Sequence, residues 1–380
     1  MIKILTVIGA RPQIIKAAAL SRAIKNSFSD KIEEKILHTG QHYDTNMSEV
    51  FFQEMNIPAP HFNLNIGSGS HGEQTAKMIG GIEKVLQDEK FDAVVLFGDT
   101  NSTLAGAISA SKIHVPIIHI EAGLRSFNMA MPEEINRIVC DQLSTLLFAP
   151  TETAMKNLKN EGFFTSKATF SNGLQRSIYN SGDIMYDNSL FYASLAEEKN
   201  NILERLHLKN EKYVLATIHR DNNTDNPERL TAILEALSDI AEQNAVKIVL
   251  PLHPRTKKML QQTTHAELFT KILDCGKFQI IPPASFFEII LLEKNAQIIM
   301  TDSGGVQKEA YFFKKPCVIL RPETEWVEIV EQGAGIVMDA DYDKITDAYN
   351  QLISRNIDYQ PVFGNGHAAE FILEKTLEFL

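Results

Sequence analysis

One short stretch combines the residue types and spacing that bind a phosphate group. Residues 300–310, MTDSGGVQKEA, form a short apolar run that breaks at Asp302-Ser303-Gly304-Gly305 and is followed by helix-forming residues. A strand, a turn and a helix start in this order direct unpaired backbone N–H groups and the positive end of the helix dipole to one point. The Ser303 hydroxyl can cap the helix or donate to an anion, and the paired glycines let a pyrophosphate approach the backbone closely. We therefore expect a phosphate at this turn, although strand–helix turns also carry Ser and Gly for geometric reasons alone.

Three carboxylates lie at the ends of predicted strands or at the start of a helix in the first half of the chain. Asp99 follows the run AVVLFG, Glu121 follows PIIHI, and Glu133 opens the helix PEEINR. Because ligands gather at the carboxyl ends of strands in an open parallel sheet, we expect these groups to converge on one cleft. Each could separately cap a helix, pair with a cation or be solvated, but together they resemble a general acid/base set whose pKa values neighbours can tune.

Two cations stand near the first predicted strand. The turn after this strand reads GARPQIIK, which places Arg11 in the turn and Lys16 about one helical turn further along. Both side chains could face the same cleft, although Arg11 could instead fix the turn and Lys16 could be solvated. The glycine spacing matches neither a P-loop nor a dinucleotide-binding turn. The stretch therefore gives little indication of P-loop chemistry or NAD binding.

The second half of the chain offers polar side chains at further strand ends. His219 and Arg220 follow YVLATI, and His253 follows KIVLPL. His219 could supply a cationic or hydrogen-bonding contact to the phosphate, whereas His253 could equally orient its own turn. Glu309 lies six residues after Ser303 on the helix that faces the expected anion. There it could accept hydrogen bonds from a ribose diol or simply be an exposed helix residue.

The composition limits the class of protein that carries these residues. With 380 residues, of which 44% are hydrophobic, the chain has ample material for two domains with separate cores. A formal net charge of -11 argues against a nucleic-acid partner, because such binding requires a basic face. An anionic ligand must therefore be held by a few local cations.

The cysteines and the apolar segments indicate a cytoplasmic protein. Cys140, Cys275 and Cys317 lie far apart without paired spacing, which suits a reducing cytosol and offers neither a disulfide framework nor a zinc site. The apolar part of the N-terminus is too short for a signal peptide, and no run approaches the length of a membrane span. We expect neither a metal nor a membrane partner.

Short apolar runs alternate with helical patterns along most of the chain. The runs include ILTVIG, AVVLFGD, YVLATIHR and QIIMTDSGG, and the predicted helices include one near Met47 and one after Arg255. Runs without in–out alternation, separated by helices, indicate parallel sheets covered on both faces. The pattern therefore predicts an α/β fold of doubly wound, Rossmann-like sheets.

A Ser-, Asn- and Gly-rich stretch at 163–187 interrupts this pattern, and we interpret it as the crossover between two domains. The predicted N-terminal domain covers 1–170 and is completed by a returning C-terminal helix at 367–380. The predicted C-terminal domain covers 187–366. The two halves share no detectable internal repeat, so their likeness is architectural.

Taken in order, these turns resemble those of the non-hydrolysing UDP-N-acetylglucosamine 2-epimerase family. The resemblance covers essentially the whole chain, through the motifs GARPQIIKAAAL, TGQH, GDTNSTLAGA, HIEAGLRS, MPEEINR, FAPTET, HRDNNTDNP, PLHP, TDSGGVQKEA and GNGHAAEFI. It implies the GT-B architecture, with two Rossmann-like domains, a C-terminal helix that crosses back and a nucleotide-sugar in the cleft. It also implies a UDP-sugar substrate and a homodimer.

The resemblance further implies roles for the motif residues. Those implied to hold UDP are Arg11, His219, Arg220, His253, Ser303, Gly304, Gly305 and Glu309. Those implied to surround the sugar are Lys16, Asp99, Glu121 and Glu133, and His219 is counted with them among the catalytic groups. The family's reaction begins with loss of UDP, and it needs no redox cofactor and no metal.

The chain departs from the family pattern at several positions. The family often has Glu where this chain has Gln13, so we assign no proton-transfer role there. The residues YDTNMSEVFF after TGQH differ from members that carry an additional UDP-N-acetylglucosamine effector site, and Lys308 replaces a common Glu. GARPQ, GQHYDTNMS and SFNMAMPEE look more like a subgroup that includes enzymes for 6-deoxy or 2,3-diacetamido uronic sugars. The sequence therefore leaves the substrate open beyond a UDP-N-acetylhexosamine.

Three other functions share parts of this pattern. A hydrolysing epimerase would release free N-acetylmannosamine, and the unbroken EAGLRS and MPEEINR motifs argue against it. A GT-B glycosyltransferase would share the fold and phosphate site but would not require several carboxylates around the sugar. A catalytically silent nucleotide-sugar sensor would have lost its acid/base groups, whereas Asp99, Glu121 and Glu133 are all present.

Overall fold

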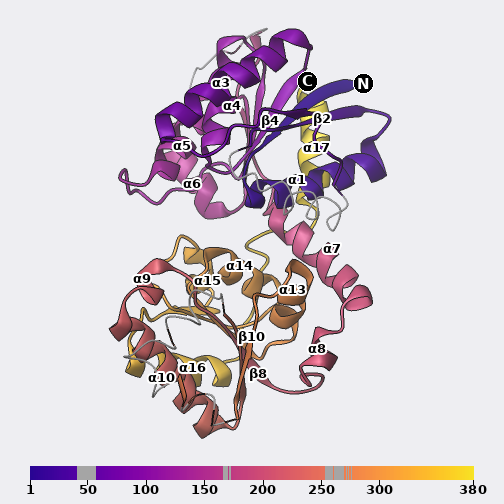
Figure 1. The fold of residues 1–380 in the computed structure, drawn as a ribbon. Coiled ribbons are helices and arrows are strands. Elements are labelled where there is room, and N and C mark those ends of the chain that lie inside the picture. Colours follow the sequence, from indigo (N-terminus) through magenta and orange to yellow (C-terminus); the bar gives the residue numbers. More distant parts are fainter. Residues whose placement is uncertain are drawn as a thin grey trace. The chain divides into compact units, whose positions relative to one another are not determined.

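The computed structural model describes residues 1–40, 57–165, 170, 173–252, 260, 269–270, 272, 274 and 276–380. The chain divides into two compact units (Figure 1), which we call unit 1 (Met1–Asn188 with Pro361–Leu380) and unit 2 (Ser189–Gln360). The helices predicted near Met47 and after Arg255 lie outside the described residues.

Unit 1 is built on a parallel sheet. Its strands are β1 (Ile2–Ile8), β2 (Ile32–His38), β3 (Phe62–Asn63), β4 (Ala93–Phe97), β5 (Ile117–Ile120), β6 (Leu146–Ala149) and β7 (Ser177–Asn180). They lie in the order β3-β2-β1-β4-β5-β6-β7, and each neighbouring pair is parallel. Chain order reverses at β1 and β4, and ligand sites in such sheets lie at the carboxyl ends of the strands beside this reversal.

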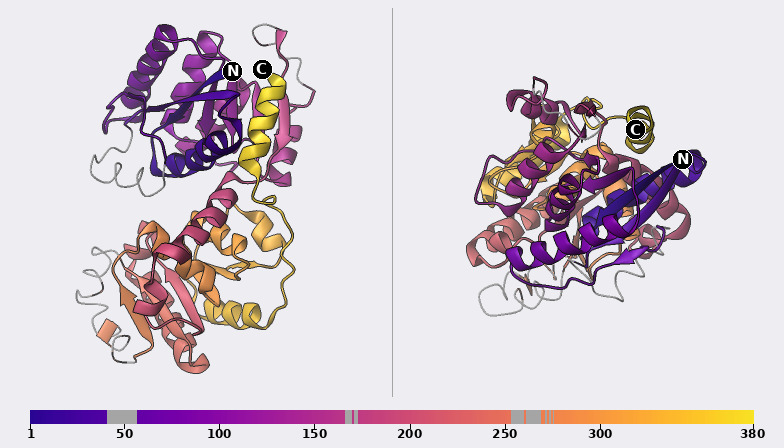
Figure 2. Two further views of the ribbon diagram at one scale, coloured as in Figure 1. Left: turned by 90° about the vertical axis from the view of Figure 1, so that its right-hand side faces the viewer. Right: turned by 90° about the horizontal axis from the view of Figure 1, so that it is seen from above.

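Helices cover both faces of this sheet. They are α1 (Arg11–Ala23), a π-helical turn η1 (Ile24–Phe28), α3 (His71–Asp88), α4 (Asn101–Lys112), α5 (Pro132–Leu143), α6 (Glu152–Asn160) and α17 (Ala368–Phe379). On one face, Leu5 and Val7 of β1 share a core cluster with Met78 of α3 and Ala107 of α4. Helix α17 packs on α1, and Figure 2 shows both chain termini at this part of unit 1.

Strand β7 differs from the sequence-based prediction. The sequence predicts a crossover between two domains over 163–187, but within this stretch Ser177–Asn180 pairs in parallel with β6. This four-residue edge strand is only half-buried, so it lacks the apolar run that marks the central strands. Unit 1 consequently extends past residue 170, and the boundary with unit 2 falls inside helix α7 (Ile184–Lys199).

The C-terminal segment is attached to unit 1 by hydrogen bonds to the residues around α7. The backbone N–H of Asp183 donates to the Phe363 carbonyl at 2.9 Å. The Asp187 carboxylate accepts from the N–H groups of Ala368 and Ala369 at 3.1 and 2.8 Å. Asp187 therefore satisfies two of the four unpaired donors at the start of α17.

Unit 2 contains a second parallel sheet. Its strands are β8 (Tyr213–Thr217), β9 (Lys247–Pro251), β10 (Phe278–Ile281), β11 (Ile298–Thr301), β12 (Cys317–Ile319) and β13 (Gly335–Val337). They lie in the order β10-β9-β8-β11-β12-β13, all in parallel, so chain order reverses at β8 and β11. The expected ligand edge of this sheet is therefore the turns that follow β8 and β11.

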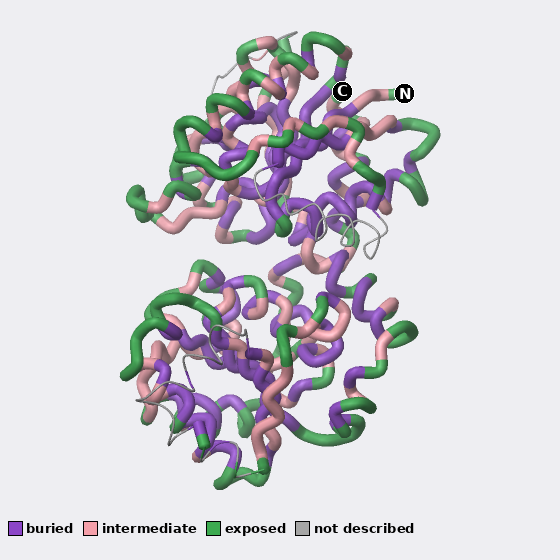
Figure 3. The backbone as a smooth tube through the Cα atoms, in the orientation of Figure 1, coloured by how far each residue is buried: buried purple, intermediate pink, exposed green. Residues whose placement is uncertain are grey.

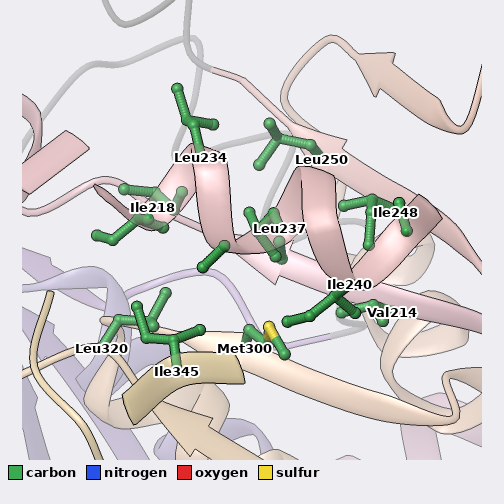
Figure 4. Close-up of a cluster of buried hydrophobic side chains, with 14 of the residues drawn as sticks. Val214, Ile218, Leu234, Leu237, Ile240, Ile248, Leu250, Met300, Leu320 and Ile345 are labelled. Carbon is green, nitrogen blue, oxygen red and sulfur yellow. The ribbon is translucent and has the colours of Figure 1, made fainter. Parts of the chain in front are cut away.

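Helices also cover both faces of the second sheet. They are α8 (Ile202–Arg205), α9 (Asp221–Thr224), α10 (Pro227–Asn244), α13 (Phe286–Asn295), α14 (Gly304–Phe312), α15 (Val327–Glu331) and α16 (Tyr342–Ser354). Figure 4 shows Leu237 and Ile240 of α10 directed at Ile248 and Leu250 of β9. On the opposite face, Leu291 of α13 belongs to a separate buried cluster. Two sheets covered on both faces confirm the predicted doubly wound α/β fold.

Burial follows this layering in each unit. In Figure 3 buried residues gather in the interior of each unit, while many of the outer segments are exposed. In the part of the chain that the structure describes, no helix is both long and apolar enough to cross a membrane.

Candidate active site

Lys16 and Glu121 form an ion pair at the carboxyl edge of the unit 1 sheet. Lys16 lies on α1, Glu121 directly follows β5, and their side chains are only 11% and 10% exposed. Gly98, which follows β4, lies against both: a Cβ atom there would stand 3.1 Å from Glu121 Oε2 and 3.3 Å from Lys16 Nζ. The turns after β1, β4 and β5 thus meet at one point, and a larger residue at position 98 would intrude on the pair.

Glu121 has an unusual backbone conformation. Its φ angle is +73°, in the left-handed region that costs a non-glycine residue about 1–2 kcal/mol. Two hydrogen bonds of 3.0 Å, from the N–H groups of Glu121 and Ala122 to the Phe148 carbonyl, hold the turn in place. Backbone strain of this kind persists where the surroundings dictate it, often at functional sites.

A buried network around His119 supports the turns that carry Asp99 and Glu121. His119 Nε2 donates to the Gly98 carbonyl at 2.9 Å, and Nδ1 donates to the Asp141 carboxylate at 2.7 Å. Since both ring nitrogens face acceptors, this environment favours the cationic imidazole. Burial would lower the pKa of His119, but the Cys140 and Asp141 side chains raise it well above its ordinary value.

Asp141 extends this network to the residues after Glu121. Its carboxylate accepts from the Gly123 N–H at 3.1 Å and pairs with Arg125 at 2.7 Å. Arg125 in turn forms a two-point contact with Glu161, at 2.7 and 2.8 Å. Burial would raise the pKa of Asp141, but His119 and Arg125 lower it below its ordinary value. These fixed charges shape the turn that presents Glu121.

Asp99 is held by two consecutive residues of α5. Arg137 Nε and Nη2 both donate to Asp99 Oδ2, at 2.9 and 2.6 Å. The side-chain amide of Asn136 donates to the Asp99 carbonyl at 2.8 Å. The Asp99 side chain is 30% exposed, so it stays accessible beside this clamp.

The structure places the two glutamates at the start of α5 differently. Glu133, which the sequence singled out, is exposed in the first turn of α5. Glu134 is buried and accepts hydrogen bonds from Ser126 N, Ser126 Oγ and Phe127 N, at 2.8 to 2.9 Å. Burial would raise the pKa of Glu134, but these donors and Arg137 lower it. The buried network therefore includes Glu134, while Glu133 faces outward at the same helix end.

Gln13 has a structural role next to Arg11. Its Oε1 accepts from the N–H groups of Gly9 and Ala10, at 2.9 and 3.2 Å, and its Nε2 donates to the Phe97 carbonyl and Thr103 Oγ1, both at 2.9 Å. These contacts join the turns after β1 and β4. Arg11 is exposed in the first turn of α1.

In unit 2, Asp302 holds the turn that follows β8. The fully buried Asp302 carboxylate accepts from the backbone N–H groups of His219 and Arg220 and from the Asn223 amide, all at 3.1–3.2 Å. His219 Nδ1 also lies 2.9 Å from Asp302 Oδ1. The sequence placed Asp302 in the phosphate-binding motif, but its role is to fix the turn that carries His219 and Arg220. Burial would raise the pKa of Asp302, but the His219 side chain leads the contacts that lower it.

The Ser303 turn has the geometry that the sequence predicted. Ser303 is the N-cap of α14, with its Oγ accepting from Val306 N at 3.5 Å. A Cβ atom at Gly304 would meet Glu325 Oε1, whereas at Gly305 its nearest neighbour would be Ser303 Oγ, 3.9 Å away. A side chain at Gly304 would thus displace the end of the Glu325 side chain, whereas Gly305 leaves the start of the helix open to a ligand.

Two further ionisable side chains of unit 2 were not identified from the sequence. Arg321, in the loop after β12, donates to Glu325 at 2.9 Å and lies near Gly304. Its position in RPETE, directly after a predicted strand, was the available signal. Glu293 of α13 is fully buried, and burial first and Glu309 second raise its pKa well above the ordinary value. Glu309 itself is half-buried on α14.

One predicted site residue, His253, lies outside the described residues. Within the residues that are described, no group of three His, Cys, Asp or Glu side chains is arranged to hold a metal ion. Unit 1 thus brings Lys16, Asp99 and Glu121 to one sheet edge, and unit 2 brings His219 and Ser303 to another.

Comparison with known proteins places this chain among nucleotide-sugar enzymes. Residues 24–377 match the family model for UDP-N-acetylglucosamine 2-epimerase. The chain is 48% identical over 373 residues to the UDP-2,3-diacetamido-2,3-dideoxy-D-glucuronate 2-epimerase of Pseudomonas aeruginosa, covering 98% of both chains. It is 43% identical over 373 residues to the UDP-N-acetylglucosamine 2-epimerase of Methanocaldococcus jannaschii, again over 98% of both.

The solved structures agree. The crystal structure of the Methanocaldococcus jannaschii enzyme in complex with UDP-GlcNAc and UDP is similar with a TM-score of 0.80 and 43% identity, over 99% of each chain. A UDP complex of the Staphylococcus aureus enzyme MnaA has a TM-score of 0.80 and 31% identity, over 100% of this chain and 98% of that one. This likeness confirms the predicted GT-B architecture.

Proposed function

Because the chain belongs to the UDP-N-acetylglucosamine 2-epimerase family, we propose that it reversibly inverts C2 of a UDP-N-acetylhexosamine without releasing free sugar. It is an isomerase that acts on a nucleotide-sugar. The observation that carries the reaction type is the pairing of Lys16 with Glu121 and of Arg137 with Asp99 at one edge of the unit 1 sheet. Two positioned carboxylates suit proton transfer at a carbon whose stereochemistry must change.

The order of bond changes follows from the substrate. The C2 proton of an acetamido sugar has no adjacent carbonyl to stabilise its loss, so direct deprotonation would be very slow. When the C1–O bond to UDP breaks first, oxocarbenium character at C1 makes the C2 proton acidic. A carboxylate then takes that proton, a C1=C2 double bond forms, and the intermediate is a 2-acetamidoglucal. A proton returns to the opposite face of C2, and a phosphate oxygen of UDP re-adds to C1.

We assign the proton transfers to unit 1. Asp99 and Glu121 are the proposed acid/base groups, since each is partly exposed and each carboxylate is held by a cationic side chain, Arg137 and Lys16 respectively. Glu133 completes the predicted set from the exposed first turn of α5. Lys16 is also placed to neutralise charge that develops near Glu121 as the sugar reacts.

We assign UDP to unit 2. The N-terminus of α14, capped by Ser303 and open at Gly305, offers backbone donors to the pyrophosphate. His219 and Arg220 stand in the turn that Asp302 fixes beside it, and Glu309 on α14 is the proposed ribose contact. Arg11 of unit 1 and His253 are further proposed UDP contacts. Donors directed at the leaving phosphate lower the barrier to C1–O cleavage.

A modified sugar is a second candidate for the substrate. Identity to the Pseudomonas aeruginosa 2,3-diacetamido uronate enzyme, 48%, exceeds the 43% to the Methanocaldococcus jannaschii UDP-N-acetylglucosamine enzyme over the same number of residues. UDP-2,3-diacetamido uronic acid is therefore the first alternative to offer beside UDP-N-acetylglucosamine.

Incubation in D2O tests the reaction directly. The protein is expected to place deuterium at C2 of the recovered UDP-sugar and to convert it to a mixture of C2 epimers, because the proton that returns comes from solvent. NMR of each candidate UDP-sugar follows both changes. Absence of exchange with every UDP-N-acetylhexosamine offered would falsify the proposal, and accumulation of free sugar with UDP would indicate a hydrolysing enzyme instead.

We also propose that the protein is a cytoplasmic homodimer that supplies cell-surface polysaccharide synthesis. The family resemblance supports the dimer, and the reduced, buried Cys140 and Cys317 suit the cytosol. Light scattering of the purified protein and fractionation of cells that express it check the two statements separately.

A further inference from the structure

We propose that Arg137 is a positioning residue that presents one chosen oxygen of Asp99 to the substrate, and that Glu134 sets the orientation of Arg137. This inference rests on the proposed epimerase function and adds two residues to it. It is carried by the hydrogen bonds that connect the exposed loop before α5 to the Asp99 carboxylate.

The contact between Arg137 and Asp99 is asymmetric. Both Arg137 Nε and Arg137 Nη2 donate to Asp99 Oδ2, at 2.9 and 2.6 Å. Among the residues that the structure describes, none donates a hydrogen bond to Asp99 Oδ1. A guanidinium that binds one carboxylate oxygen with two donors fixes the position of that oxygen and leaves the other oxygen available to take a proton.

Arg137 is itself fixed from the opposite side. Its Nη1 donates to Glu134 Oε2 at 2.9 Å, one helical turn earlier on α5. The Arg137 side chain is only 14% exposed, and the Glu134 side chain 2%. Burial would lower the pKa of Arg137, but Asp99 and Glu134 raise it above its ordinary value, so the guanidinium stays charged. A buried guanidinium held by two carboxylates has little freedom to move.

Glu134 connects this clamp to the loop that precedes α5. Its carboxylate accepts from Ser126 N, Ser126 Oγ and Phe127 N, so it takes four donors when Arg137 is included. Phe127 of this loop is 75% exposed and has a φ of +57°, in the left-handed region that is costly for a non-glycine residue. The continuous path Phe127–Glu134–Arg137–Asp99 means that a shift of the loop is transmitted to the proposed acid/base group.

The substitutions Arg137→Lys and Arg137→Ala test this role. A lysine keeps the charge but cannot donate to Asp99 with two N–H groups and to Glu134 at once. We expect kcat to fall by about tenfold to a hundredfold in Arg137→Lys, the effect of losing one charge-assisted hydrogen bond, with KM unchanged. In Arg137→Ala, millimolar guanidinium chloride should restore part of kcat, and sodium chloride at equal concentration should not.

Isotope exchange separates positioning from a general structural effect. Deuterium entry at C2 should slow more than scrambling of an ¹⁸O label from the C1–O bridge into the other β-phosphate oxygens, because Asp99 acts on C2. The matched control is Arg205→Lys, which changes an exposed arginine paired with Glu288 in unit 2 and should leave both rates unchanged.

Three outcomes would overturn the inference: wild-type kcat in Arg137→Lys, no guanidinium rescue of a folded Arg137→Ala, or failure of both variants to fold, which would make Arg137 a folding residue. The wild-type protein is assayed first. If it shows no C2 exchange, the proposed function fails, whereas exchange in the wild type with an unaffected Arg137→Lys rejects the positioning role alone.

Discussion

The two candidate ligand-binding edges of this protein differ in the chemical groups that line them. In unit 1, charged side chains crowd the turns after β1, β4 and β5, as the pairs Lys16–Glu121 and Arg137–Asp99 show. In unit 2, the turn at Ser303 offers a helix N-terminus and two glycines, and its buried carboxylate, Asp302, binds backbone N–H groups of the neighbouring turn. The same fold class therefore presents two kinds of strand-end surface.

The difference follows from what each task requires. A pyrophosphate carries permanent charge, and preorganised backbone N–H groups bind it without a change of protonation. A group that gives and takes a proton must be a titratable side chain held in a fixed orientation. Substitutions that remove side chains should therefore impair catalysis in unit 1 and UDP affinity in unit 2.

The largest expected effect is on proton transfer in unit 1. Asp99→Asn and Glu121→Gln keep side-chain shape but remove the basic oxygen, so turnover and C2 deuterium exchange should each fall by about a hundredfold or more. UDP affinity, measured by titration calorimetry, should remain that of the wild type. Asp88→Asn, which changes an exposed carboxylate at the end of α3, serves as the control. Unchanged turnover in both site variants would remove them from the mechanism.

A smaller effect is expected when Asp302, which holds the turn after β8 in unit 2, is replaced. Asp302→Asn replaces one acceptor oxygen by a donor, so the N–H groups of His219 and Arg220 lose part of their support. UDP affinity should fall by roughly tenfold, the scale of one hydrogen bond to a charged group. Calorimetry with UDP measures it, and Asp347→Asn, an exposed residue on α16, is the control. An unchanged Kd would mean that this turn does not contribute to UDP binding.

The sequence predicted the groups that sit directly at strand ends. Glu121 and Asp99 were identified because parallel strands place their carboxyl ends at one edge, and Ser303 because a strand, glycines and a helix follow in order. The two sheets were predictable for the same reason, since central strands are continuous apolar runs. The half-buried edge strand β7 has no such run and was taken for a crossover.

The supporting residues were harder to predict because their roles depend on which way a helix faces. Nothing local distinguishes Glu133 from Glu134, yet only Glu134 is buried. The available signal was spacing: Glu134, Arg137 and Asp141 stand at positions i, i+3 and i+7, which is one face of α5. Charged residues repeated on one helix face next to a strand-end carboxylate indicate a buried network rather than a solvated surface.

The smallest expected effect is on the free energy of unfolding and comes from His119, which is buried in unit 1. His119 donates to the Gly98 carbonyl and to Asp141, and its pKa is raised in the folded protein above the unfolded value of 6.5. Its stabilising contribution is therefore complete below about pH 6.5 and is lost as pH rises towards the folded-state pKa, because the unfolded chain releases its proton first.

His119→Gln exposes this contribution. The difference in unfolding free energy between wild type and variant should be largest near pH 6 and should shrink by about 1.4 kcal/mol for each pH unit above about 6.5. Chemical denaturation across this range measures it, with His367→Gln, which changes an exposed residue of the same unit, measured in parallel as the control. A pH-independent difference for His119→Gln would mean that the imidazole is neutral. In that case hydrogen bonds without a buried positive charge on His119 would hold the turns that carry Asp99 and Glu121. The contrast between charged side chains in unit 1 and backbone N–H groups in unit 2 would then be limited to the pairs Lys16–Glu121 and Arg137–Asp99.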